Sequence, residues 1–331
     1  MVFAMKNLIV IIILFLGSCP KMAEDLDPQF PCDPVNSDVP ATGDPALEWV
    51  TPVSGGTNIE HHIFCSGAAQ TEVSYHIYKP GVYTTEPARR FPVIYWLHGG
   101  GQGPGIQGIP LISNYFDNAI REGLIPPMLI VFPNSPVRPV GGRSVISMWV
   151  DSKDKKSPIE TMVIKELVPH IDATYHTVAS REGRALDGFS MGGYGAARLG
   201  FKYNDMFSAI SIMGAGPMQE KLIETPRIPE QAREALLRLI YGGSQDYFMA
   251  VSPRKLAEEN ASDLKENVFI RIAVGDLDET FSDNQKFHEF LTQLGIPHKF
   301  IIGKGIPHSA PQLLNYLREE NHAFYRKVFE P

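Results

Sequence analysis

The sequence predicts an α/β fold with a mostly parallel central sheet flanked by helices, and three observations predict it. Two continuous apolar runs, at 91–97 and 127–132, have the composition of strands that are covered on both faces. Further strands are expected at 184–189, which should also be buried, and at 207–213. Two further segments, 158–175 and 192–203, have the apolar or small residues of packed helices. Strands that alternate with helices through short links form parallel sheets.

The composition excludes several classes of protein. The chain has 331 residues, of which 44% are hydrophobic and 20% are charged, so it can form a large core and is not a disordered chain. Its formal net charge is -7 and it has no run rich in lysine and arginine, so we expect no nucleic-acid partner. A single α/β domain can reach this length, and we expect it at 46–331.

The first residues predict a segment that directs export. Lys6 precedes an unbroken apolar run at 8–16, which is short for a membrane span and is followed by small residues. This pattern is typical of a secretory signal peptide, here 1–18. Residues 19–45 are rich in proline, aspartate and asparagine and show no apolar period, which predicts a tether or lead-in before the domain.

The three cysteines extend this interpretation. The apolar run ends in Leu-Gly-Ser-Cys at Cys19, which resembles the lipobox of bacterial lipoproteins, whose cysteine is lipidated. We therefore expect an exported bacterial protein that meets a membrane only through a lipid anchor on Cys19. The alternative is a secreted protein in which Cys19 has no role. An odd cysteine in an exported protein needs an explanation, and lipidation of Cys19 leaves Cys32 and Cys65 to pair as a disulfide.

The remaining elements follow in chain order. Residues 58–65 and 72–78 alternate like two strands of a partly exposed antiparallel edge. Later strands and helices are expected at 268–274, 282–294, 298–302 and 310–329. The least regular segment is 217–267. It has helical patterns at 229–240 and 253–264, and forms either a small helical cap or an ordinary crossover.

A candidate nucleophile lies where a strand gives way to a helix. Gly188-Phe189-Ser190-Met191-Gly192 has the pattern Gly-x-Ser-x-Gly, which in an α/β-hydrolase fold places the serine on a sharp, strained turn. Glycines two positions away on each side let the strand and the helix pass closely. The alternative is a glycine-rich turn with an idle serine. The predicted strand before Ser190 and helix after it favour the nucleophile.

A glycine run after the strand 91–97 predicts an oxyanion hole. His98 is followed by Gly99, Gly100 and Gly101, and backbone N–H groups in such a loop can come close to a substrate. In this fold one donor follows the nucleophile, here Met191, and another comes from this loop, here Gly100. We expect His98 to be structural. A phosphate-binding loop is the alternative, but the lysine and hydroxyl residue that it requires are absent.

The base and the acid are expected in turns after later strands. His308 lies just past the strand 298–302 and is the candidate base. The strand 268–274 is followed by Asp276, Asp278 and Glu279. Asp278 is preferred as the acid that orients the histidine, with Asp276 as the alternative. Spacing alone does not separate the two.

The chain resembles the esterase D-like group of α/β-hydrolases, which includes the feruloyl and acetylxylan esterases of carbohydrate esterase family one. The segments that carry the resemblance are 91–100, 160–175, 184–202, 272–278 and 295–308. The resemblance implies a triad of Ser190, Asp278 and His308, because the acid of the family takes the fourth position of a Gly-x-x-Asp turn, which here begins at Gly275. It also implies that no cofactor or metal is needed.

The resemblance further implies an exported feruloyl esterase that releases hydroxycinnamate from plant cell-wall polysaccharide. An acetylxylan or other small-acyl carbohydrate esterase is the first alternative, and a siderophore-ester hydrolase or an acyltransferase is the second. Substrate choice lies in loops that the motifs do not fix. Asn134 and Trp149 are the candidates at the rim of the site. Trp149 either stacks on a sugar or phenolic ring or anchors its loop to the core.

Overall fold

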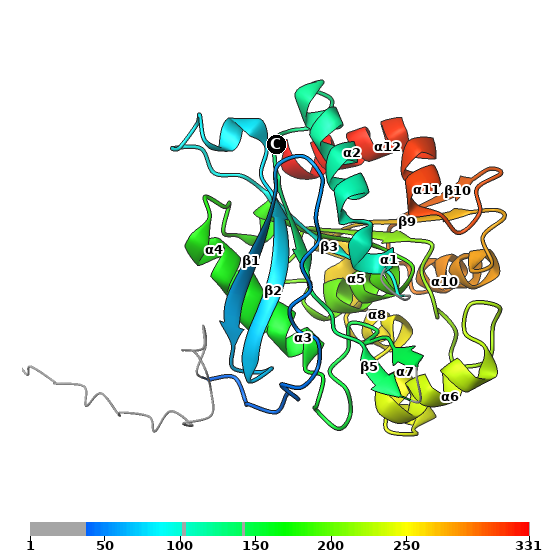
Figure 1. Ribbon diagram of the computed structural model, residues 1–331. Coiled ribbons are helices and arrows are strands. Elements are labelled where there is room, and N and C mark those ends of the chain that lie inside the picture. Colours follow the sequence, from blue (N-terminus) through cyan, green and yellow to red (C-terminus); the bar gives the residue numbers. More distant parts are fainter. Residues whose placement is uncertain (1–37, 101–103, 141–142, 331) are drawn as a thin grey trace, which may run out of the picture. The chain divides into compact units, whose positions relative to one another are not determined.

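The computed structural model describes residues 38–100, 104–140 and 143–330. In this part of the chain eight strands form one sheet in the order β1-β2-β4-β3-β7-β8-β9-β10 (Figure 1). The strands are β1 Ile59–Ser66, β2 Thr71–Tyr78, β3 Val93–Leu97, β4 Leu129–Pro133, β7 Arg184–Phe189, β8 Ala209–Met213, β9 Phe269–Gly275 and β10 Lys299–Gly303. All neighbours are parallel except β1–β2 and β2–β4. The predicted mostly parallel sheet with an antiparallel edge is confirmed.

Helices cover both faces of this sheet because its strands are apolar on both sides. Along β3, Tyr95 and Leu97 belong to one buried cluster, and Ile94 and Trp96 belong to another on the opposite face. The first face carries α3 Ile159–Thr161, α4 Val168–Thr174, α5 Met191–Lys202, α8 Pro253–Glu259, α9 Ala261–Asn267 and α10 Phe281–Gln293. The second carries α1 Pro104–Gln107, α2 Ile109–Arg121, α11 Ala310–Tyr316 and α12 Arg318–Phe329 (Figure 1).

Several helices differ in detail from the prediction. The predicted helix 158–175 is continuous but contains a π-helical turn, Met162–Leu167, between α3 and α4. The predicted helix 310–329 is interrupted at Leu317, which separates α11 from α12. The helix α2 was not predicted, although Ile109, Ile112 and Phe116 follow helical spacing and are buried. Its proline-containing first turn adjoins the glycine run, whose composition indicates a loop.

One part of the irregular segment 217–267 packs on the sheet as a crossover, and another part forms a cap. It contains α6 Glu230–Leu239 and α7 Gln245–Ala250, followed by α8 and α9. Leu256 of α8 and Leu264 of α9 are buried in the core of the first face, as in an ordinary crossover. Leu236 of α6 belongs to the same buried cluster but also borders a cavity, as in a cap. A short hairpin, β5 Arg138–Val140 with β6 Arg143–Val145, was also not predicted.

The N-terminal expectations lie mostly outside the described residues. The chain divides into the units Met1–Phe30 and Pro31–Pro331, and every described residue belongs to the second. The signal peptide 1–18, Cys19 and Cys32 are not among them. Cys65 lies in β1 and is disulfide-bonded. Because Cys32 lies outside the described residues, its role as the partner of Cys65 stays a prediction. Within the described ranges, no helix combines the length and the apolar character needed to cross a membrane.

Candidate active site

Ser190 lies on a strained turn between β7 and α5, as its motif predicts. Its φ of 62° and ψ of -120° are rare for a residue with a side chain, and such strain costs roughly 1–3 kcal/mol. Gly192 permits the turn, because a Cβ there would lie 1.8 Å from the carbonyl oxygen of Leu97 at the end of β3. The serine hydroxyl is therefore presented at the carboxyl end of the parallel sheet.

His308 and Asp278 reach the same edge from the ends of β10 and β9. His308 Nε2 lies 3.0 Å from Ser190 Oγ, and His308 Nδ1 lies 2.9 and 2.8 Å from the two carboxylate oxygens of Asp278. The side chains of His308 and Asp278 are only 5% and 1% exposed, so water does not compete for these contacts. The three residues form one continuous hydrogen-bonded chain.

The structure separates the two candidate acids that spacing left open. Asp278 is buried and faces His308, while its Oδ1 also accepts hydrogen bonds from Thr280 N and Oγ1, both at 2.8 Å. Asp276 is exposed, and its Oδ1 accepts a hydrogen bond of 2.6 Å from Gly305 N. Asp276 thus holds the loop that carries His308 without touching its ring.

The charge of Asp278 is stabilised where it stands. Burial by itself would raise the pKa of this carboxyl, but the hydrogen bonds from His308 and Thr280 lower it below its ordinary value. Asp278 is therefore ionised and accepts a hydrogen bond from the Nδ1–H of His308. Glu279 also places a ligand atom within 4.8 Å of both residues, as in a metal site. Both ring nitrogens of His308 are already engaged, however, by Asp278 and Ser190.

The glycine loop lies directly beside the serine. A Cβ on Gly99 would lie 3.3 Å from Ser190 Cβ and 3.3 Å from the carbonyl oxygen of Phe189, so only glycine fits without displacement. Gly100 and Met191, the predicted oxyanion donors, border the two cavities next to Ser190. Both residues thus lie where the fold is expected to supply its oxyanion donors. Their role as donors stays a prediction.

Trp149 is not exposed for a sugar or phenolic ring to stack on it, which corrects one of its two predicted roles. Its side chain is fully buried, and its Nε1 donates a hydrogen bond of 3.2 Å to the carbonyl oxygen of His98. The ring of His98 packs edge-on against the indole at 5.0 Å between centroids. Trp149 is therefore the anchor of its loop, and His98 is structural as expected.

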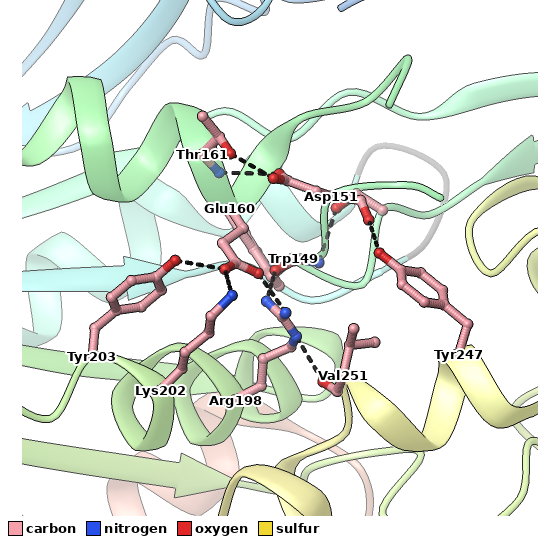
Figure 2. Close-up of polar contacts among 10 residues, drawn as sticks. Trp149, Asp151, Glu160, Thr161, Arg198, Lys202, Tyr203, Tyr247 and Val251 are labelled. Carbon is pink, nitrogen blue, oxygen red and sulfur yellow. Dashed lines mark hydrogen bonds and ion pairs between the residues drawn. The ribbon is translucent and has the colours of Figure 1, made fainter. Parts of the chain in front are cut away.

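A buried polar network lies behind this anchor (Figure 2). Arg198 on α5 is 1% exposed and pairs with Glu160 on α3, which also accepts hydrogen bonds from Lys202 and Tyr203. Burial alone would raise the pKa of Glu160, but the charges of Arg198 and Lys202 and these hydrogen bonds lower it to about 2. Asp151 accepts two hydrogen bonds from Thr161. Both carboxylates, Glu160 and Asp151, are thus engaged by side chains of the fold itself.

Two cavities share Gly100 and Met191 as lining residues, and Ser190 borders the larger of the two. This larger cavity, of about 430 Å³, has an apolar wall that 145–146 and 228–236 supply. The wall residues are Val145, Ile146, Ile228, Ala235 and Leu236. The smaller, of about 110 Å³, is bordered by the glycine loop and by Asn134. Asn134 is buried and donates to the carbonyl oxygen of Trp49, so its amide nitrogen holds the rim in place.

The residues of the α6 wall were missed by the sequence analysis. No motif marks them, because they belong to the segment whose pattern left a cap and a crossover equally open. Arg198 was missed as well, although an arginine on the apolar face of a predicted helix is a signal, since buried arginines are paired. Val145, which ends the hairpin, and Ile146, which follows it, have too short an apolar pattern to stand out.

Comparison with known proteins gives a family match. Residues 66–295 match a family model described as "Putative esterase". An esterase of Mycobacterium tuberculosis is 31% identical over 152 residues, which are 46% of this chain and 31% of that protein. An endo-1,4-beta-xylanase/feruloyl esterase of Xylanibacter ruminicola is 26% identical over 241 residues, or 71% of this chain and 30% of that protein. The matches thus span about a third of the length of these relatives.

Solved structures share the fold. A ferulic acid esterase superposes with a TM-score of 0.66 at 22% identity, over 83% of this chain and all of that one. A ferulic acid esterase of Anaeromyces mucronatus in complex with ferulic acid gives a TM-score of 0.58 at 18% identity, over 85% of this chain and 95% of that one. At these identities the likeness shows the α/β-hydrolase fold alone.

Proposed function

The chain belongs to this esterase family, and from that premise we propose that it is an exported serine carboxylic-ester hydrolase that releases hydroxycinnamate from plant cell-wall polysaccharide. The observation that carries the proposal is the hydrogen-bonded chain from Ser190 through His308 to Asp278. A nucleophile within reach of a base, itself oriented by a buried acid, is the arrangement that covalent acyl transfer requires.

The proposed reaction forms and breaks an acyl-enzyme. Ser190 Oγ attacks the ester carbonyl while His308 Nε2 takes its proton, and Asp278 stabilises the imidazolium. The N–H groups of Gly100 and Met191 hold the negative oxygen that develops. His308 then gives its proton to the leaving alcohol, and afterwards takes one from the water that releases the acid and frees Ser190.

The larger cavity supports an aromatic acyl group. Its volume of about 430 Å³ lies within the range of roughly 300–1,000 Å³ that is usual for small-molecule sites. An acetyl group would leave most of its apolar wall uncovered, whereas a phenyl ring with its vinyl link could bury against Ile228, Ala235 and Leu236. The names of the xylanase/feruloyl esterase relative and of the ferulic acid complex agree with this choice.

Export and lipidation belong to the same proposal. The apolar run at 8–16 and the cysteine that follows it support a lipid anchor on Cys19, which would place the enzyme at the cell surface or in the periplasm. The intact mass of the mature protein tests this, because lipidation removes 1–18 and adds acyl chains to Cys19. A mature protein without added lipid would contradict the anchor and leave the esterase unaffected.

Two esters tested side by side separate the substrate classes. We expect wild-type protein to hydrolyse methyl ferulate and 4-nitrophenyl acetate, and Ser190→Ala to hydrolyse neither. Turnover of the acetate alone would keep the serine esterase but move the substrate to acetylated glycans. Failure on both esters at every pH would refute the proposed activity. An added alcohol acceptor, with analysis of the products, distinguishes hydrolysis from acyl transfer.

A further inference from the structure

Two consecutive residues beside the site have a backbone conformation that side chains disfavour. Met148 has a φ of 58° and Trp149 a φ of 54°, and both are fully buried. Non-glycine residues in this left-handed region are costly and persist only where their surroundings hold them, which is most common at functional sites. The contacts that hold them therefore indicate what the strain is for.

Contacts from α5 hold the backbone of Trp149. Arg198 Nη1 donates a hydrogen bond of 2.9 Å to the carbonyl oxygen of Trp149 (Figure 2). The same guanidinium donates through Nε to the carbonyl oxygen of Val251, also at 2.9 Å, and pairs with Glu160. Because its donors bind three separate segments and it is 1% exposed, Arg198 cannot turn away without leaving a buried charge unpaired.

The indole of Trp149 connects α5 to the start of the glycine loop, at His98 and Gly99. On one side it meets α5, where a Cβ on Gly195 would lie 2.5 Å from Trp149 Cδ1. On the other side its Nε1 donates to the carbonyl oxygen of His98, and its ring packs against the ring of His98. His98 Nδ1 in turn lies 2.9 Å from the carbonyl oxygen of Gly99. The two peptide groups that precede Gly100 are thus held by the indole of Trp149 and by the ring of His98.

We propose that Trp149 is a positioning residue for ester hydrolysis, which fixes the His98–Gly99 backbone so that Gly100 N–H points at the oxyanion, and that the Arg198–Glu160 pair holds Trp149 in place. This inference rests on the proposed function. Its physical ground is that oxyanion donors act by being oriented before charge develops, and a glycine loop has no stiffness of its own. The strain at 148 and 149 is then the means by which the indole is turned under the loop.

The chain offers a matched pair of variants for the test. Trp149→Phe keeps a buried ring but removes the hydrogen bond to His98. Trp49→Phe removes an equivalent bond, since Trp49 is buried and its Nε1 donates 2.8 Å to the carbonyl oxygen of Asp44. With 4-nitrophenyl acetate we expect Trp149→Phe to lower kcat about tenfold or more and change KM less than about twofold. Trp49→Phe should retain the wild-type kcat.

A second variant and a second readout keep structural damage apart from lost positioning. Gly195→Ala retains the Trp149 hydrogen-bond donor but displaces the indole, and should also lower kcat. Both variants should weaken inhibition by phenylboronic acid, whose tetrahedral adduct places an oxygen in the oxyanion hole, in proportion to kcat. An unchanged kcat in folded Trp149→Phe, or equal losses in both tryptophan variants, would overturn the positioning role alone. Wild-type protein that neither cleaves the ester nor binds the boronic acid would refute the proposed function as well.

Discussion

At the scale of single residues, the account depends on how Asp278 differs from Asp276. Asp278 N donates to the carbonyl oxygen of Gly275, which closes a turn and directs the following carboxylate toward His308. Asp276 N instead donates to the carbonyl oxygen of Gly303, so this residue prolongs the pairing of β9 with β10. Within one turn, Asp278 therefore binds the catalytic histidine, whereas Asp276 binds the backbone of the loop that carries it.

Replacement of each aspartate by asparagine should show this difference. Asp278→Asn keeps the shape but cannot stabilise the imidazolium, so kcat for methyl ferulate should fall on the order of 10³–10⁴-fold. Because the pKa of Asp278 is lowered, its carboxylate stays charged over the working range, and the loss should persist from neutral to alkaline pH. Asp276→Asn still accepts the hydrogen bond from Gly305 and should lose far less. Equal losses in the two variants would contradict the assignment.

The sequence could predict the chemistry of the site but not its walls. Ser190 and His308 are fixed by a motif and by their places after strands, because the fold brings the carboxyl ends of parallel strands to one edge. Trp149 could not be assigned, since an aromatic residue in a loop has the same pattern whether it contacts a ligand or the core. Ala235 and Leu236 carry no signal of their own, because their position depends on how α6 docks.

At the scale of elements, α6 decides what the larger cavity accepts. Its residue Ala235 is half-buried and borders the cavity, whereas the next residue toward the N-terminus, Glu234, is exposed and does not. The helix thus presents one face to the substrate and the other to solvent. A larger side chain on the first face should reduce the space for the acyl group without disturbing Ser190.

Filling the cavity should separate large from small esters. Ala235→Phe is expected to lower kcat/KM for methyl ferulate at least about tenfold relative to that for 4-nitrophenyl acetate, which needs little of the cavity. Glu234→Phe adds the same side chain to the exposed face and should leave the ratio unchanged. If Ala235→Phe leaves the ratio as it is, the aromatic acyl group does not bind against α6.

The ion pair that joins α3 to α5 should make stability depend on acid. The pKa of Glu160 is about 2 in the folded protein, below its ordinary value of 4.5. A carboxylate with a lowered folded pKa contributes stability that is present above its unfolded pKa and is lost as the pH falls through the folded value. Between pH 4.5 and 2 the wild-type protein should therefore lose on the order of 3 kcal/mol from this group.

Urea unfolding at pH 7 and pH 3 measures this contribution. The Glu160→Gln variant has no carboxylate to protonate, so its free energy of unfolding should fall less between the two pH values than that of the wild type. Glu234→Gln removes an exposed carboxylate and should follow the wild-type curve. A decline in Glu160→Gln as steep as in the wild type would show that the pair contributes nothing to acid sensitivity.

At the scale of the whole molecule, the sheet places the catalytic residues at its edge and the hydrophobic core on its two faces. Both faces are covered by helices, so the core lies away from the edge where Ser190, His308 and the glycine loop meet. The buried network around Arg198 is the exception, because it belongs to the core and also reaches the oxyanion loop through Trp149. We expect substitutions in that network to affect both the free energy of unfolding and kcat.

The overall architecture was the part most open to prediction, and its irregular connections the least. Central strands such as β3 and β4 have continuous apolar runs, which favour buried strands. The split of α11 from α12 at Leu317 has no local signal, because the apolar spacing continues through it. Cys32 as the disulfide partner of Cys65 and the lipidation of Cys19 stay predictions that rest on the sequence.

Reaction with a fluorophosphonate tests the central claim most directly, because an activated serine attacks phosphorus whatever its natural ester is. The account predicts that one equivalent is incorporated into the folded wild-type protein and that peptide mapping places it on Ser190. Ser190→Ala should take up none, and His308→Ala should react far more slowly. Folded wild-type protein that remains unlabelled, or that carries the label on another residue, would contradict Ser190 as the nucleophile.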